Sequence, residues 1–275
     1  QETGQILPPP ALVQQAYLQN HEAEYKDSVE NPEAFWERVA KELDWSKPWD
    51  KVFEWNYPTF EWFLGGKCNI TSNALDRHLA NGNKNKAAFI FLGEDGSERV
   101  FTYGRLAQMV NRFANGLKSL GVKKGDRVVI YMPLSPEGAI AMLACARIGA
   151  VHSVVYAGFS VGSLRGRILD AQAKVVITAD VGYRRGNEVD LKGICDQTVE
   201  GMDLVEHVVV WSRKGPPANP GARDVDFDQL MAESSIHCPV EEMDSEDPLY
   251  ILYTSGTTGT PKGVLHVHGG YMVGT

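Results

Sequence analysis

The sequence predicts an α/β fold of mainly parallel βαβ layers, preceded by a helical, aromatic-rich N-terminal extension. From about Thr71 onward, short β-branched runs alternate with amphipathic stretches, which is the pattern of parallel strands joined by crossover helices. The 275 residues are 43% hydrophobic and 23% charged, enough for one large or two small domains with real cores. These observations indicate a globular α/β protein.

The first 70 residues differ in composition from the remainder. Three prolines, Pro8 to Pro10, precede helical stretches expected around Ala11–Tyr25 and Pro32–Leu43. An aromatic cluster follows, made of Trp45, Trp49, Phe53, Trp55, Tyr57, Phe60, Trp62 and Phe63. In isolation this cluster would expose a large apolar patch, so we expect residues 1–70 to dock on the following domain. Core packing is the expected role of the aromatic side chains, in preference to a ligand cage.

Residues 71–275 are expected to form the first part of a larger domain. Helices are expected at Asn73–Asn81, Tyr103–Leu120, Pro136–Ile148, Val161–Gln172 and Asp190–Glu200. Strands are expected at Ala88–Leu92, Arg127–Tyr131, His152–Val155, Val175–Thr178, His207–Val210 and Tyr250–Tyr253. Gly121 should end the second helix, and the proline-rich stretch Arg213–Asp226 should be a loop. The acidic run Glu241–Asp247 is expected to be a solvated turn.

Charge and composition exclude several classes of function. The net charge of -8 argues against nucleic acid or an anionic membrane surface as partner, because either would need a broad positive field. The most apolar region, Val128–Val161, contains charges and prolines that a membrane span would not carry. Four cysteines without a paired motif, and a start without a signal peptide, indicate a reducing cytoplasm. His266 and His268 have no nearby ligand to complete a shell, so no metal site is expected.

The segment after the strand Tyr250–Tyr253 carries the main functional signal. It reads Thr254, Ser255, Gly256, Thr257, Thr258, Gly259, Thr260, Pro261, Lys262 and Gly263. The glycines let backbone N–H groups converge on an anion, the hydroxyl groups add donors, and Lys262 supplies a mobile cation. The nucleotide P-loop has its lysine directly after the last glycine, whereas two residues intervene here. We expect this loop to bind the ATP phosphates, rather than to act as a flexible linker, because a strand and a proline confine it.

This decapeptide resembles the signature loop of the adenylate-forming superfamily. The run Gly263–His266, followed by Gly269-Gly270-Tyr271, is similar to acetyl-CoA synthetases of the AMP-forming type. Further similarity to that branch lies upstream, in Trp62-Phe63, Asn69, Leu75–His78, Tyr156–Ser160, Gly166–Ile168 and Ile177–Asp180. The resemblance covers the chain from about Tyr17. It implies the N-terminal domain of these enzymes in incomplete form, with ATP, Mg²⁺ and coenzyme A as cofactors and acetate as substrate.

A second anion site is expected in the segment Asp180–Asn187. Arg184 and Arg185, beside Gly186, offer charge-assisted contacts to a phosphate, although a solvated basic loop is the alternative. The resemblance assigns Arg184, Arg185, Gly186 and Asn187 to the phosphates of coenzyme A, with Ala157-Gly158 against the cofactor. Many relatives carry a second basic residue at the position of Asn187, so we expect this contact to be weaker here or to be made by Arg185. Because each candidate loop follows the C-terminal end of a strand, Tyr156–Ser160, Asp180–Asn187 and Thr254–Lys262 are expected to face one crevice.

The resemblance implies a reaction in two halves. A carboxylate attacks the α-phosphorus of ATP to give an acyl-adenylate and pyrophosphate, and the thiol of coenzyme A then displaces AMP. Lys262 would stabilise the leaving phosphates. Relatives carry the acyl pocket, the adenine site and a C-terminal domain with a catalytic lysine further on, so we expect this chain to be inactive alone. The alternatives are a non-catalytic module that binds coenzyme A or a nucleotide, and a ligase for propionate or a larger acid. Acyl preference and oligomeric state do not follow from the sequence.

Overall fold

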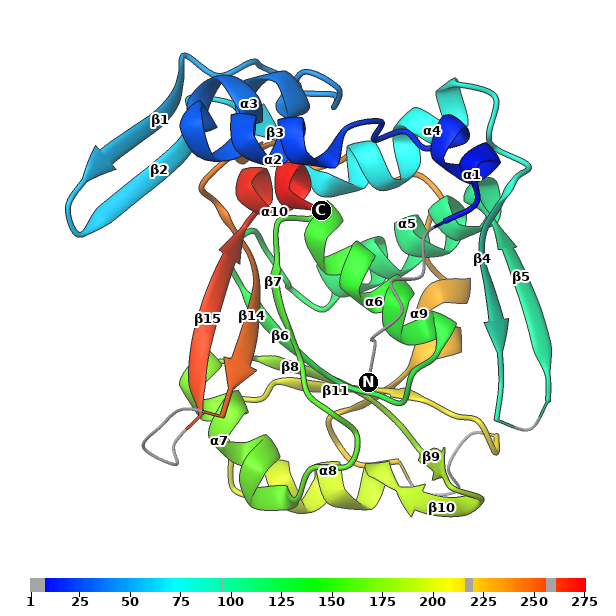
Figure 1. The fold of residues 1–275 in the computed structure, drawn as a ribbon. Coiled ribbons are helices and arrows are strands. Elements are labelled where there is room, and N and C mark those ends of the chain that lie inside the picture. Colours follow the sequence, from blue (N-terminus) through cyan, green and yellow to red (C-terminus); the bar gives the residue numbers. More distant parts are fainter. Residues whose placement is uncertain (1–7, 95, 216–219, 256–260) are drawn as a thin grey trace, which may run out of the picture. The chain divides into compact units, whose positions relative to one another are not determined.

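The computed structural model describes residues 8–94, 96–215, 220–255 and 261–275 (Figure 1). Between Leu43 and Asp44 the chain divides into two compact units. This boundary lies before residue 70, where the sequence suggests that the extension ends. Docking of the extension on the large domain therefore stays a prediction. The large unit carries both candidate sites.

The N-terminal unit contains three helices. They are α1 (Pro10–Gln15), α2 (His21–Glu30) and α3 (Pro32–Ala40). Arg38 of α3 bonds Glu24 of α2 at 2.6 Å, which joins the last two helices. The expected continuous helix over Ala11–Tyr25 is wrong, because Ala16 is extended with ψ 137° and α2 begins anew. The Asn20 side chain accepts a hydrogen bond from the N–H of Ala23, so it caps that new start.

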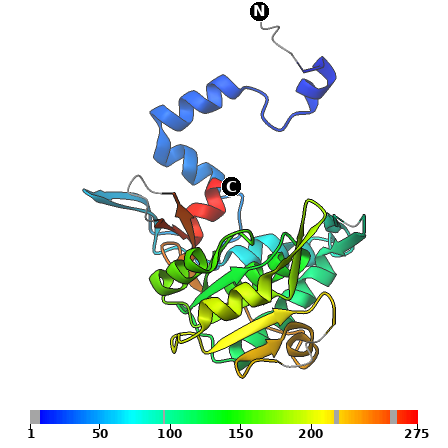
Figure 2. The same ribbon diagram turned by 90° about the horizontal axis from the view of Figure 1, so that it is seen from below.

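Most of the aromatic cluster lies on a β-hairpin, and Trp45 and Trp49 precede it, so residues 1–70 are not helical throughout, contrary to expectation. The strands of this hairpin are β1 (Lys51–Asn56) and β2 (Thr59–Leu64), and the hairpin projects from the body of the large unit (Figures 1 and 2). At its base, Phe63 is 2% exposed and packs against Trp45 and Trp49 with ring centroids 5.4 and 5.2 Å away. At its tip, Tyr57 is 84% exposed. Only the base therefore has the expected role of core packing.

The central feature of the large unit is a seven-stranded sheet with the order β12-β11-β8-β6-β7-β14-β15. Its strands are β6 (Arg127–Tyr131), β7 (Val151–Val154), β8 (Val175–Ala179), β11 (His207–Trp211), β12 (Asp224–Asp226), β14 (Pro248–Thr254) and β15 (Lys262–Val267). All neighbouring pairs are parallel except β14 and β15, which form an antiparallel pair at one edge. This arrangement confirms the expected α/β class with a mainly parallel sheet.

Helices cover both faces of this sheet because its strands are apolar on both faces. Val128 and Ile130 of β6 join the core under α5 (Tyr103–Ser119), α6 (Pro136–Arg147) and α9 (Phe227–Ala232). The alternate residues Val129 and Tyr131 join a second core under α7 (Val161–Ala171) and α8 (Leu191–Val199). Figure 1 shows the two helical layers on opposite sides. The side chains of a strand alternate between faces, so one strand supplies both cores.

Several short elements complete the large unit. They are β3 (Lys67–Cys68), a π-helix (Ser72–Asp76), α4 (Arg77–Ala80), β4 (Ala87–Leu92), β5 (Glu98–Thr102), β9 (Val181–Arg184), β10 (Asn187–Asp190), β13 (Met243–Asp244) and α10 (His268–Gly274). Gly121 ends α5 with φ +81°, and the N–H of Val122 bonds the carbonyl of Leu117 at 3.1 Å, which confirms the expected glycine cap. The stretch expected to be a loop up to Asp226 ends in strand β12. In the part of the chain that the structure describes, no helix is long and apolar enough to cross a membrane.

The acidic run before β14 is not a solvated turn, contrary to expectation. Met243 is 1% exposed, and its strand β13 pairs with β3. The Ser245 hydroxyl donates to the carbonyl of Phe63 at 2.8 Å, and the carboxylate of Glu246 accepts from the N–H of Trp62 at 2.8 Å. The run therefore ties the aromatic hairpin to the sheet. The acidic composition did not indicate this role, because the polar side chains of the run form hydrogen bonds with backbone groups that are far away in the sequence.

Candidate functional site

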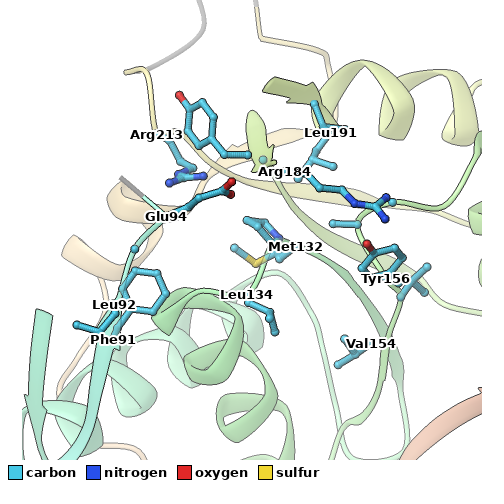
Figure 3. Close-up of a pocket in the computed structure, with 18 residues that line it drawn as sticks. Phe91, Leu92, Glu94, Met132, Leu134, Val154, Tyr156, Arg184, Leu191 and Arg213 are labelled. Carbon is cyan, nitrogen blue, oxygen red and sulfur yellow. The ribbon is translucent and has the colours of Figure 1, made fainter. Parts of the chain in front are cut away.

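A cavity of about 510 Å³ lies at the C-terminal ends of β6, β7 and β8 (Figure 3). It is lined by Phe91, Leu92, Gly93, Glu94, Met132, Pro133, Leu134, Val154, Val155, Tyr156, Ala157, Gly158, Gly182, Tyr183, Arg184, Val189, Leu191 and Arg213. Ligands of open parallel sheets bind at this edge, because the loops that follow the strands converge there. The position and the size of the cavity suit a small-molecule cofactor.

The segment Asp180–Asn187, expected as a loop, forms a hairpin of β9 and β10. Arg184 and Asn187 are paired across its end, and the turn between them consists of Arg185 and Gly186 with φ +52° and +75°. A two-residue turn with positive φ at both positions matches the twist of a hairpin. For Arg185 that conformation costs about 1 kcal/mol, and glycine adopts it freely. Arg184 therefore lies on the strand and Arg185 at the tip.

Three of the residues expected to contact coenzyme A line this cavity together. They are Ala157, Gly158 and Arg184. The guanidinium of Arg184 lies 5.5 Å from the centre of the Tyr156 ring. A Cβ atom on Gly158 would stand 2.4 Å from Cε1 of that ring and 3.0 Å from Nη1 of Arg184, so a larger residue here would require these side chains to move. Arg185, Gly186 and Asn187 are not among the lining residues.

Tyr131, at the end of β6, fixes the loop that contains Ala157 and Gly158. Its hydroxyl group donates a hydrogen bond of 2.9 Å to the carbonyl of Phe159. Burial raises the pKa of Tyr131 to about 12, so this group stays protonated and remains a donor. The loop therefore has a fixed position against the sheet.

Two charged residues of the cavity were missed by sequence reasoning. Arg213 follows the end of β11, and Glu94 follows the end of β4. The carboxylate of Glu94 accepts a hydrogen bond from the N–H of Gly186 at 3.0 Å. The other segments were chosen because basic residues follow the end of an expected strand. The same criterion applies to Arg213 and would have identified it as a candidate.

The described ends of the proposed ATP-phosphate loop lie on the antiparallel pair at the edge of the sheet. Thr254 is the last residue of β14, Lys262 is the first of β15, and the two are paired. Thr254, Ser255 and Lys262 are exposed. Gly256, Thr257, Thr258 and Gly259, with Thr260, lie outside the described residues. The loop thus joins two adjacent strands and begins at the C-terminal end of β14.

A second cavity, of about 650 Å³, lies beside Pro261 and the helix α7. Here the hydroxyl of Tyr253 donates to Oδ2 of Asp170 at 2.6 Å, and the guanidinium of Arg167 lies 5.4 Å from the centre of the Tyr253 ring. Burial and the bond to Asp170 raise the pKa of Tyr253. Of the described residues of Thr254–Lys262, Pro261 lines this second cavity, while Tyr156–Ser160 and Asp180–Asn187 contribute to the first. That all three segments face one crevice stays a prediction, because residues 256–260 lie outside the described ranges.

The histidines near the loop have other partners than a metal. The ring of His266 stacks on that of Tyr250 with centroids 4.4 Å apart, while Nδ1 of the buried His268 accepts a hydrogen bond from the N–H of Ile70 at 3.4 Å. Within the described ranges, no group of three or more His, Cys, Asp or Glu residues could hold a metal ion. Among the described cationic residues, Arg184 and Arg213 line the first cavity, Arg167 lines the second, and Lys262 is exposed next to Pro261 in the sequence.

Comparison with known proteins agrees with this arrangement. The family model of AMP-binding enzymes matches residues 76–275, and the model of the acetyl-coenzyme A synthetase N-terminus matches residues 21–74. An acetyl-coenzyme A synthetase of Methanothrix thermoacetophila is 53% identical over 244 residues, which are 87% of this chain and 37% of that protein. One of Deinococcus radiodurans is 51% identical over 257 residues, covering 93% of this chain and 40% of the relative.

A solved structure shares the fold. The acetoacetyl-CoA synthetase from Streptomyces lividans superimposes with a TM-score of 0.85 at 26% sequence identity, over 96% of this chain and 41% of the other. The chain thus spans only about two fifths of the length of such relatives, between 37% and 43% of the curated ones. The match of the AMP-binding model covers most of the sequence, and the fold agrees with it. The chain therefore belongs to the family of AMP-binding enzymes.

Proposed function

We propose that this chain is the N-terminal part of an AMP-forming ligase that joins acetate, or another short-chain carboxylate, to coenzyme A. The carrying observation is the phosphate-loop sequence that ends in Lys262, at the C-terminal end of β14 in a chain of this family. The match of residues 21–74 to the acetyl-coenzyme A synthetase N-terminus supports the short-chain branch. A cytoplasmic location belongs to the same proposal, and the four buried, unpaired cysteines are consistent with it.

In the first half-reaction, the carboxylate attacks the α-phosphorus of ATP and pyrophosphate leaves. Negative charge grows on the leaving oxygens, so donors placed around them lower the barrier. In our proposal, Thr254, Ser255, Gly256, Thr257, Thr258 and Gly259 bind the phosphates. Lys262 follows the departing charge with its flexible ammonium group. Mg²⁺, when bound to ATP, would neutralise part of the same charge.

In the second half-reaction, the thiol of coenzyme A attacks the acyl carbon and AMP leaves. Arg184 is proposed to bind a phosphate of the cofactor, with the backbone at Ala157 and Gly158 against it. Arg185, Gly186 and Asn187 belong to the same proposal, although they do not line the cavity. The N–H of Gly186 is bonded to Glu94, and the side-chain amide of Asn187 donates to the carbonyl of Arg185 at 3.3 Å. These residues would act through the shape of the hairpin.

Acetate-dependent exchange of pyrophosphate into ATP tests the first half-reaction. In our proposal this chain is part of a longer protein, and we expect that longer protein to catalyse exchange. The 275-residue chain alone should not catalyse it. Lys262→Ala should lower exchange about 100-fold or more, the usual effect of losing one donor to developing charge. Lys118→Ala, at an exposed position on α5, is the control and should change little.

Three results would contradict or redirect the proposal. Exchange catalysed by the 275-residue chain would contradict the expectation that this chain is inactive without the rest of the protein. Full exchange activity of Lys262→Ala would contradict the proposed role of that lysine. Binding of coenzyme A without any exchange by the longer protein would favour a non-catalytic module. Faster exchange with propionate than with acetate would favour the ligase for a larger acid.

A further inference from the structure

The cavity at the ends of β6, β7 and β8 contains a second guanidinium, that of Arg213, which has no part in the function proposed above. It lies 4.7 Å from the centre of the Tyr183 ring and 5.3 Å from that of Trp211. Neither Arg213 nor Arg184 has a carboxylate within 4.0 Å among the residues that the structure describes. Figure 3 shows the two labelled arginines on different sides of the cavity.

Several other basic side chains of the large unit are occupied. Arg147 bonds Asp76 at 3.0 Å, and Arg223 donates to the carbonyls of Met202 and Val205 at 2.7 and 2.8 Å. Even Lys214, next to Arg213 in the chain, is paired with Glu188. A guanidinium that rests on aromatic rings keeps its charge and its N–H donors for an incoming anion. Arg213 and Arg184 share this state.

The backbone at Arg213 is held firmly. Its N–H donates to Oδ1 of Asp180 at 2.9 Å, and the N–H of Lys214 donates to Oδ2 at 2.8 Å. Asp180 directly follows β8 and also accepts from the N–H of Val181, where β9 begins, at 2.7 Å. One carboxylate thus fixes the base of the β9–β10 hairpin, which carries Arg184, relative to the turn that carries Arg213.

The carboxylate that lines the same cavity is that of Glu94. It is bonded to the N–H of Gly186 at 3.0 Å, and no ion pair joins it to Arg213. Its charge lowers the affinity of the cavity for anions but leaves the guanidinium accessible. The charge of the chain as a whole is -8, so phosphate binding here depends on local cations.

We infer that Arg213 is a second phosphate-binding residue of the coenzyme A site, which acts together with Arg184. The inference rests on the proposed function, because it takes coenzyme A as the ligand of this cavity. Coenzyme A carries phosphate at two separate places, a pyrophosphate and a 3′-phosphate, so two separated cations suit it better than one. Arg185 and Asn187 do not line the cavity, and Arg213 does.

Calorimetric titration of the 275-residue chain with coenzyme A and with dephospho-coenzyme A tests this inference. Arg213→Gln should weaken binding of coenzyme A about tenfold, the effect of one lost charge-assisted contact, and Arg213→Lys should restore part of it. If Arg213 contacts the 3′-phosphate, the loss is confined to coenzyme A. If it contacts the pyrophosphate, both ligands lose equally. The matched control is Arg105→Gln, because Arg105 also lies over a ring, that of Phe101 at 5.4 Å, but outside the cavity lining.

If Arg213→Gln binds each ligand as tightly as the unmodified chain does, the inference about Arg213 is wrong, while the assignment of the cavity to coenzyme A still stands. If the unmodified chain binds neither ligand, the assignment of this cavity to coenzyme A fails, and the role of Arg213 with it. In the longer protein, Arg213→Gln should raise the KM for coenzyme A about tenfold and leave pyrophosphate–ATP exchange unchanged. Exchange needs no coenzyme A. Its absence in the unmodified enzyme would therefore refute the proposed ligase separately from Arg213.

Discussion

The carboxylate of Asp180 accepts a hydrogen bond from the backbone N–H of Arg213, with 2.9 Å between Oδ1 and the nitrogen. This contact joins the residue after β8 to a residue just after the neighbouring strand β11. Together with the bonds to Val181 and Lys214, it makes Asp180 the common anchor of one wall of the cavity. A half-buried carboxylate with three backbone donors is well satisfied, and its removal leaves all three N–H groups without that acceptor.

Asp180→Ala is therefore expected to affect both stability and ligand binding. We expect the free energy of unfolding to fall by about 2–3 kcal/mol, the range for loss of hydrogen bonds to a charged acceptor. Coenzyme A should also bind more weakly, since Arg213 and the hairpin lose their common anchor. Urea unfolding and calorimetry measure the two effects. Asp203→Ala, at an exposed turn, is the control. Unchanged stability of Asp180→Ala would contradict the anchoring role.

Glu94→Gln should strengthen the binding of coenzyme A. Glutamine keeps an acceptor oxygen for the N–H of Gly186 but removes the negative charge from the cavity. We expect affinity to rise about two- to threefold at low salt, as exposed charges contribute little, and the gain should shrink at high salt. Glu206→Gln changes the net charge equally at an exposed site outside the cavity and should have no effect. Weaker binding by Glu94→Gln would show that the hydrogen bond matters more than the charge.

Two helical glycines should respond in opposite ways to alanine. A Cβ atom on Gly116 of α5 would lie 2.6 Å from Cγ of Leu230 on α9, so Gly116→Ala should destabilise the chain by about 1–3 kcal/mol through overpacking. Gly166 of α7 has nothing within 4 Å of that position. Gly166→Ala should therefore stabilise the chain by about 0.5–1 kcal/mol, because alanine loses less backbone entropy in a helix. Urea unfolding midpoints would show the difference, and equal effects would contradict the close packing of α5 on α9.

Acid should destabilise the large unit through two buried histidines. Burial lowers the pKa of both His152 and His268 to about 4. Between about pH 6.5 and 4 the unfolded chain takes up these protons and the folded chain does not, so stability falls as pH drops. Each histidine should contribute about 1.5 kcal/mol of loss between pH 6.5 and 5.

His152→Phe tests this pH dependence. Phenylalanine keeps the ring contact with Tyr250, whose centroid lies 5.6 Å from that of His152, and removes an Nδ1 atom without a hydrogen-bond partner. The loss of stability between pH 7.5 and 5 should become smaller in this variant, as measured by urea unfolding. The control is His237→Phe, because His237 is exposed. An unchanged pH dependence in His152→Phe would show that the pKa of His152 does not differ between the folded and the unfolded chain.

Local patterns were sufficient for most elements of the large unit. The expected strand over Arg127–Tyr131 is β6 without change, and the expected helix over Tyr103–Leu120 is α5 to within one residue. Both have strong apolar periodicity and clear ends. The errors fell on polar or mixed segments, where the pattern is short. The acidic run before β14 and the turn at Arg185-Gly186 take their structure from distant partners, Phe63 and Glu94 among them.

For the candidate site, too, the sequence predicted some features and not others. Composition and motif identified Arg184, Gly158 and the segment from Thr254 to Lys262 as candidates, since each combines suitable chemistry with the end of a strand. Which of them share a cavity did not follow, because that depends on the order of strands in the sheet. The order β11-β8-β6-β7 brings Arg213, Arg184 and Gly158 to one edge, whereas β14 carries Thr254 beyond them.

The α/β class, the periodic elements and the chemical character of each loop followed from the order of residues, because these features depend on neighbours in the chain. The anchoring of Arg213 by Asp180 and the bond from the hairpin turn to Glu94 became visible only in the folded molecule. The fold also showed that Arg184 and not Arg185 lines the cavity. Hydrogen bonds and burial depend on distance in space, and the fold brings together residues as far apart in the chain as Glu94 and Gly186, which are separated by 92 positions.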